Sequence, residues 1–131
     1  MNDFFVVKGQ KFDVMFENMS ERGINDFQRQ CYSFVEGNIK NLYKTALKSI
    51  KKHIKTKEFH DVYISDFGIT EKEIFKSISF SSIYFSQYEE KGFGFLGSWE
   101  ADIEHGLGVR FCLNNDGAEL VEIEGQDCLI Q

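Results

Sequence analysis

The chain has 131 residues, a length that suits one domain built around one hydrophobic core. Hydrophobic residues make up 42% of it, including 14 Phe, so it can fold without metal or disulfide staples. Its net charge of −6 argues against non-specific binding to nucleic acid, which depends on positive charge.

The charge is divided unevenly along the chain. Residues 1–57 hold 11 basic side chains against 6 acidic ones, a balance of +5, whereas residues 58–131 hold 4 against 15, a balance of −11. No apolar run reaches the roughly 20 residues of a membrane-spanning helix, and the N-terminal sequence lacks a secretory signal. We therefore expect a cytoplasmic protein that binds no membrane.

The three cysteines are Cys31, Cys112 and Cys128, an odd number without CxxC spacing. This pattern indicates neither a disulfide framework nor a zinc knuckle. We expect all three to be reduced, buried thiols.

The first predicted elements are two short strands, residues 4–7 and 12–16. The second alternates apolar and polar side chains, as a half-buried strand does. Gly9 and Gln10 between them are typical of a hairpin reversal.

A helical period of apolar residues then runs from Ile24 to Ile54, and Asn25 and Gln28 have the spacing of an N-cap and its box partner. A single helix over 25–55 would be about 46 Å long, longer than the roughly 35 Å that we expect for a domain of this size. The sequence therefore predicts a break near Gly37-Asn38, where one helix ends and the next is capped.

The second part of this helical region is rich in lysine. Its positive charge near a helix C-terminus fits a solvated face or an intramolecular charge partner, and it could also dock an acidic partner or nucleic acid. The residues are Lys40, Lys44, Lys48, Lys51, Lys52, Lys55 and Lys57.

Thr70 and Glu73 have capping-box spacing and predict a short third helix. Four strand-like runs follow at 79–86, 92–100, 107–113 and 119–124, separated by turn residues. Connections this short require antiparallel pairing. The expected fold is a single α+β domain over residues 1–131, an antiparallel meander sheet with two or three helices packed on one face.

The most distinctive motif is Glu104-His105-Gly106-Leu107-Gly108, a few residues after Trp99. The structural interpretation assigns Trp99 to the core, His105 to hydrogen bonds with loop amides, and both glycines to a tight reversal or bulge. The alternative is a metal or acid–base site of Glu104 and His105 with Glu100 or Asp102, since histidine titrates near neutrality and carboxylates bind cations.

Other chemistry-bearing patterns are incomplete. The glycines of residues 92–97 complete neither a dinucleotide-binding nor a P-loop pattern, and no serine lies in a nucleophile elbow. We therefore predict no catalytic residue, no metal ligand and no cofactor.

The order of these features resembles a bacterial family of uncharacterised domains that carry a Trp, acid, Glu-His-Gly-Leu-Gly signature. The matching residues are Trp99, residues 104–109, residues 69–74, and the helical stretch 24–28 through Tyr32 and Phe34. Several such families occur among small immunity and accessory proteins of toxin systems. The resemblance implies a bacterial context and a toxin as a candidate partner, with no established activity.

The leading functional expectation is a non-enzymatic protein-interaction module, immunity-like, that binds a basic partner through an acidic surface. The metal-centred alternative stays open, as does a structural subunit that self-associates through an unpaired sheet edge. The expected partner-binding residues are Asp102, Glu104, Asp116, Glu119 and Glu122.

Overall fold

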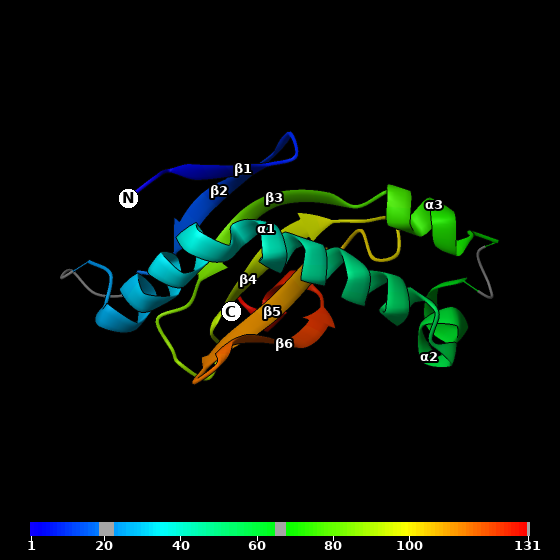
Figure 1. The fold of residues 1–131 in the computed structure, drawn as a ribbon. Helices are drawn as coiled ribbons and strands as arrows, with labels where there is room; N and C mark the ends of the chain where they lie inside the picture. Colours follow the sequence, from blue (N-terminus) through cyan, green and yellow to red (C-terminus); the bar gives the residue numbers. More distant parts are fainter. Residues whose placement is uncertain (19–22, 65–67, 131) are drawn as a thin grey trace.

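Six strands form one sheet in the order β1-β2-β3-β4-β5-β6 in the computed structural model, which describes residues 1–18, 23–64 and 68–130. The helix α1 crosses one face of this sheet, and α2 and α3 lie at the C-terminal end of α1 (Figure 1). The strands are β1 (Phe4–Val7), β2 (Gln10–Phe16), β3 (Ser79–Phe85), β4 (Phe93–Ser98), β5 (Leu107–Asn114) and β6 (Gly117–Glu124). The helices are α1 (Asp26–Ile54), α2 (Lys57–Phe59) and α3 (Glu71–Lys76), with a π-helical turn η1 (His60–Ile64) and a 3₁₀ turn η2 (Gln126–Cys128).

The α+β class is confirmed, but the expected all-antiparallel meander is wrong at one place. β1 pairs with β2, and β3 through β6 pair in succession, all antiparallel. β2 and β3 are parallel, with Asp13 opposite Ser82 and Phe16 opposite Phe85. A parallel pair needs a long crossover, and the segment containing α1, α2, η1 and α3 supplies it. Short hairpin connections therefore predict the pairs on either side of this crossover but not the pair that it joins.

The predicted helix break at Gly37-Asn38 is also wrong, because α1 is continuous over 29 residues. Asn38 caps no new helix; its Nδ2 donates to the carbonyl oxygen of Phe34, one turn earlier, at 2.8 Å. Gly37 is exposed and tolerated inside the helix. The length is accommodated because the last turns of α1 pack against α3, and the ring of His53 contacts Phe59 of α2. Ile50 and Ile54 are buried there.

The starts of α1 and α3 are as predicted. Asn25 and Gln28 form a full capping box at the start of α1. Thr70 and Glu73 form another at the start of α3. Each box satisfies backbone N–H groups that the first helical turn leaves without partners. These starts could be predicted from the sequence because each capping box depends on two residues only three positions apart.

The core lies between α1 and the sheet and is rich in phenylalanine. Phe12, Phe85, Phe93, Phe95 and Phe111 are among its fully buried side chains. A smaller cluster covers the opposite face of the sheet, where the C-terminal segment brings Cys128, Leu129 and Ile130 onto Tyr84 and Leu96.

The three cysteines are free thiols, as expected, but they are not all buried. Cys31 lies in the main core and Cys128 in the smaller cluster. Cys112 is half-buried on β5, opposite the exposed Glu119 of β6. The prediction of three buried thiols is therefore wrong for Cys112.

Candidate functional site

The loop between β4 and β5 contains the most distinctive motif and is closed by its own side chains. Asp102 accepts a hydrogen bond from the backbone N–H of His105 at 3.1 Å, and its Oδ2 lies 3.0 Å from His105 Nδ1. The backbone N–H of Gly106 donates to the carbonyl oxygen of Asp102 at 2.9 Å. These three contacts make one compact turn of residues 102–106.

The two glycines of the motif have different roles. Gly106 has a φ of +69°, and a Cβ there would lie 2.8 Å from the carbonyl oxygen of Gly97. At Gly108 a Cβ would lie 2.7 Å from Cys128 Sγ. Gly106 thus permits the backbone reversal, and Gly108 permits the close approach of the C-terminal segment.

A cleft of about 470 Å³ opens beside this turn. Its walls come from the C-terminal end of α1, from α2 and η1, from the 99–106 loop and from the segment joining β6 to η2. We call it the acidic cleft, for the four carboxylates that line it, Glu58, Asp102, Glu124 and Asp127. Segments far apart in the sequence therefore meet at one place on the surface.

Aromatic side chains form one wall of the acidic cleft. The ring of Phe59 lies 4.9 Å from that of Tyr63 and 5.5 Å from that of Trp99, centroid to centroid. Trp99 is 6% exposed, and its Nε1 is buried without a hydrogen-bond partner among the described residues. A buried indole N–H without an acceptor is uncommon, because the lost hydrogen bond to water costs free energy.

The carboxylates of the cleft act on its ionisable neighbours. Burial, followed by the charges of Asp102 and Glu124, raises the pKa of the Tyr63 hydroxyl above its usual value. Glu58, Glu124 and Asp127 are exposed, whereas Asp102 is half-buried. The cleft is therefore a region of negative potential at neutral pH.

Two histidines border the cleft, and their surroundings shift them in opposite directions. The hydrogen bond with Asp102 and the charge of that carboxylate raise the pKa of His105. Burial lowers the pKa of His53, although Glu58 and Glu124 partly oppose it. The surroundings thus stabilise the charged form of His105 and destabilise that of His53, relative to a free imidazole.

The predicted partner-binding residues lie in two groups. Asp102 borders the cleft, and Glu104 is exposed in the same loop. Asp116 lies in the β5–β6 turn beyond the other end of β5, a strand about 24 Å long at 3.4 Å per residue. Glu119 is exposed on β6, and Glu122 Oε1 accepts from Arg110 Nε at 3.1 Å. The five residues thus follow β5 and β6 rather than form one compact patch.

Three exposed apolar side chains accompany these carboxylates. Val62 is 55% exposed at the rim of the cleft, Ile103 is 81% exposed next to Asp102, and Val121 is 42% exposed on β6. Apolar residues exposed among charged ones are common at protein-binding surfaces.

The cleft contains three carboxylates that sequence reasoning did not select, Glu58, Glu124 and Asp127. They come from α2, the end of β6 and η2, so no local motif unites them. Within residues 1–18, 23–64 and 68–130, no group of three or more His, Cys, Asp and Glu is placed to hold a metal ion. No helix in that part of the chain is long and apolar enough to cross a membrane.

Comparison with known proteins gives one match. A family model described as a domain of unknown function, DUF6985, matches residues 1–130. No curated protein and no solved structure matches.

Proposed function

The chain belongs to the DUF6985 family of domains of unknown function, and we propose that it is a non-enzymatic module that binds a basic segment of a partner protein. The observation that carries this proposal is the convergence of Glu58, Asp102, Glu124 and Asp127 around one cleft. Among the described residues, the carboxylates that converge there from separate segments have two basic neighbours in the cleft lining, the imidazoles of His53 and His105.

A lysine or arginine side chain of the partner fits the chemistry of the cleft. Its cationic head would meet the carboxylates, where charge-assisted hydrogen bonds are the strong ones. Its methylene stem would pack on Tyr63 and the exposed side of Val62, as long basic side chains do on apolar surface. Because Phe59 and Trp99 are almost wholly buried, they support this wall rather than offer a free aromatic face.

The proposed contact surface for the partner continues from the cleft along the edge of the sheet. β6 is an edge strand of the sheet and carries Glu119, Val121 and Glu122. Together with Asp116 in the preceding turn, these residues form an acidic strip that leads to Glu104 and the cleft. Within this strip, the charge of Glu122 is paired with Arg110. A partner lying along the strip would use the cleft as its anchor, and the negative field would chiefly raise the rate of encounter.

This proposal includes an immunity-like role. In that role the module is a cytoplasmic protein of a bacterium, and its basic partner is a toxin that it holds inactive. The support is the resemblance of the Trp99 and 104–109 motif to immunity and accessory domains, together with the acidic surface.

Cross-linked capture at low salt from the native host tests the proposal. The variant Glu58→Gln/Glu124→Gln removes two charges from the cleft, Asp116→Asn/Glu119→Gln removes two from the strip, and Asp13→Asn/Glu36→Gln removes two from surfaces elsewhere. We expect to capture a partner with a basic contact segment. Its recovery should fall about tenfold or more with the cleft variant, fall less with the strip variant and stay unchanged with the control. Equal recovery by the wild type and the cleft variant would refute the cleft as the anchor.

The second candidate is a metal-binding domain or metal-dependent enzyme centred on Glu104 and His105. The Asp102–His105 contact favours it, since a carboxylate commonly orients a ligating imidazole. Elemental analysis and thermal melting with Zn²⁺ and Mn²⁺ test it. Metal-dependent stabilisation that disappears in His105→Ala would support this candidate, and melting unchanged by either metal would remove it.

A further inference from the structure

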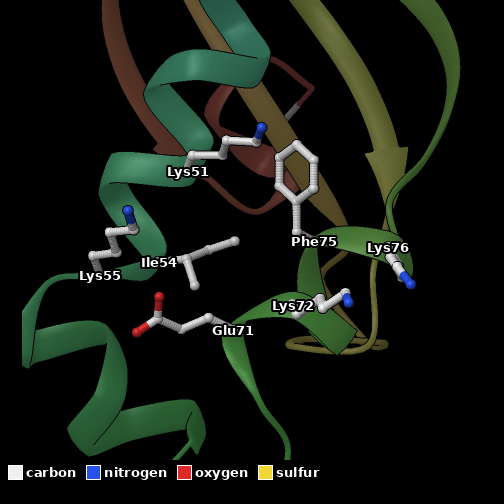
Figure 2. A pocket seen from close by; sticks show the side chains of 7 residues that line it. All are labelled: Lys51, Ile54, Lys55, Glu71, Lys72, Phe75 and Lys76. Atoms are coloured by element: carbon white, nitrogen blue, oxygen red, sulfur yellow. The ribbon is translucent and has the colours of Figure 1, made fainter.

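A second hollow lies between the C-terminal end of α1 and the helix α3, outside the acidic cleft. It has a volume of about 460 Å³. Figure 2 shows the side chains of α1 on one side of this hollow and those of α3 on the other, with Ile54 directed into the space between the two helices. We call it the lysine pocket, for Lys51, Lys55, Lys72 and Lys76, which line it.

The floor of the lysine pocket is apolar. Ile54 is 1% exposed, and Phe75 is half-buried. The ammonium group of Lys51 lies 4.9 Å from the centroid of the Phe75 ring. Lysine stems can lie along apolar surface of this kind while their ammonium groups stay free to meet an anion.

The positive charge of the pocket is not neutralised within the described part of the chain. No carboxylate there lies within 4.0 Å of any of the four ammonium groups, whereas Lys11 and Lys57 each form an ion pair elsewhere. Glu71 is the acidic residue of the pocket lining, and its Oε2 is held 2.6 Å from His60 Nε2. The lining therefore carries four cations against one carboxylate that is already engaged.

We propose that the lysine pocket binds a small organic anion with a flat apolar body, such as an aromatic phosphate monoester or carboxylate. The volume falls in the range of small-molecule sites. The ring of the ligand would lie on the half-buried ring of Phe75, which the buried Ile54 supports from below, and its anionic group would meet ammonium groups from both helices. Lysine suits this role because its long stem lets a point charge move to the anion.

Titration with 1-naphthyl phosphate tests the proposal. Binding is measured by calorimetry and by NMR of the Ile54 methyl and Phe75 ring signals. Two further probes separate the contributions, because 2-naphthol has the ring without the charge and inorganic phosphate has the charge without the ring. We expect 1-naphthyl phosphate to bind at least about tenfold more tightly than either.

Variants locate the site. Lys51→Gln/Lys72→Gln removes one ammonium group from each helix, and Lys55→Gln/Lys76→Gln does the same with the other two, so one pair remains informative if the other fails to fold. Lys40→Gln/Lys44→Gln removes the same charge from α1 outside the pocket. We expect each pocket pair to weaken binding of 1-naphthyl phosphate by about tenfold and the control pair to leave it unchanged.

Several results would overturn the proposal. These are no saturable binding of 1-naphthyl phosphate, equal affinity for inorganic phosphate, or equal weakening by the control pair. The last two would reduce the pocket to a diffuse positive charge.

Discussion

His105 Nδ1 lies 3.0 Å from Oδ2 of Asp102, three residues earlier in the chain. The contact closes the turn between β4 and β5, and Asp102 also borders the acidic cleft. The same carboxylate therefore closes a turn and borders a cleft. The two interpretations of the motif, structural turn and polar site, do not exclude each other.

The two cleft histidines should titrate on opposite sides of 6.5, the usual pKa of the side chain. The contact with Asp102 raises the pKa of His105, and burial lowers that of His53. His105 thus contributes stability that is complete below pH 6.5 and is lost as pH rises through its folded pKa. His53 has the opposite sign, because charging its buried ring destabilises the fold as pH falls below 6.5.

NMR titration of the two imidazole Cε1–H signals checks this prediction. Asp102→Asn should bring the pKa of His105 down towards 6.5 and leave that of His53 below it. A His105 pKa at or below 6.5 in the wild type would contradict the Asp102 contact in solution.

Gly37→Ala should stabilise the protein by about 0.5–1 kcal/mol. Gly37 is an exposed residue inside α1, and a Cβ there meets nothing within 4 Å, so alanine adds helix propensity without a clash. The sign of this change distinguishes two conformations of Gly37. If Gly37 ended a helix with a left-handed backbone, replacing it by alanine would destabilise the protein instead. Urea unfolding of the variant gives the answer.

Gly106→Ala should destabilise the protein by about 1–3 kcal/mol. Its φ of +69° strains any L side chain, and its Cβ would lie 2.8 Å from Gly97 O. Gly68→Ala is the matched control, because its φ is +66° and a Cβ there has nothing within 4 Å. In urea unfolding, Gly106→Ala should lower the free energy of unfolding more than Gly68→Ala does, and the difference measures the steric clash with Gly97. Equal decreases in the two variants would show that close packing at Gly106 contributes nothing.

Cys112 should be the one thiol that reacts quickly with a disulfide reagent. Burial raises the pKa of Cys31 and of Cys128 to about 12, so neither forms much thiolate at pH 8. Cys112 is half-buried, with Arg110 Nη1 3.4 Å from its sulfur. Stopped-flow labelling at pH 8 should show one fast phase that Cys112→Ser removes. A fast phase that persists in this variant would place another thiol at the surface.

The fold was predictable where its signals are local. Both capping boxes, the first hairpin and the run of hairpins from β3 to β6 follow from residues a few positions apart. The parallel β2–β3 pair was not predictable in this way, because its partners, such as Asp13 and Ser82, are 69 positions apart in the sequence. The uninterrupted α1 was missed because the size argument ignored α2 and α3, which extend the body of the protein to cover the end of the long helix.

The site was predictable only in part, for the same reason. The turn motif pointed to Asp102 and His105, which the structure brings into contact. Glu58, Glu124 and Asp127 carried no local signal beyond the acidic excess of residues 58–131, and only the folding of the chain gathers them. The same holds for the lysine pocket, where Lys51 comes from α1 and Lys72 from α3. The periodicity of the sequence predicts each helix but not that the two helices lie side by side.

NMR titration with N-acetyl-arginine amide and N-acetyl-lysine amide at low salt is the sharpest test of whether the acidic cleft accepts a basic side chain. We expect saturable shifts of the Trp99 indole N–H and of the amides of residues 102–106, and an affinity about tenfold lower in Glu58→Gln/Glu124→Gln. N-acetyl-glutamine amide, which is neutral, should cause none. Absence of saturable shifts at the cleft, or equal shifts with the neutral amide, would contradict the account.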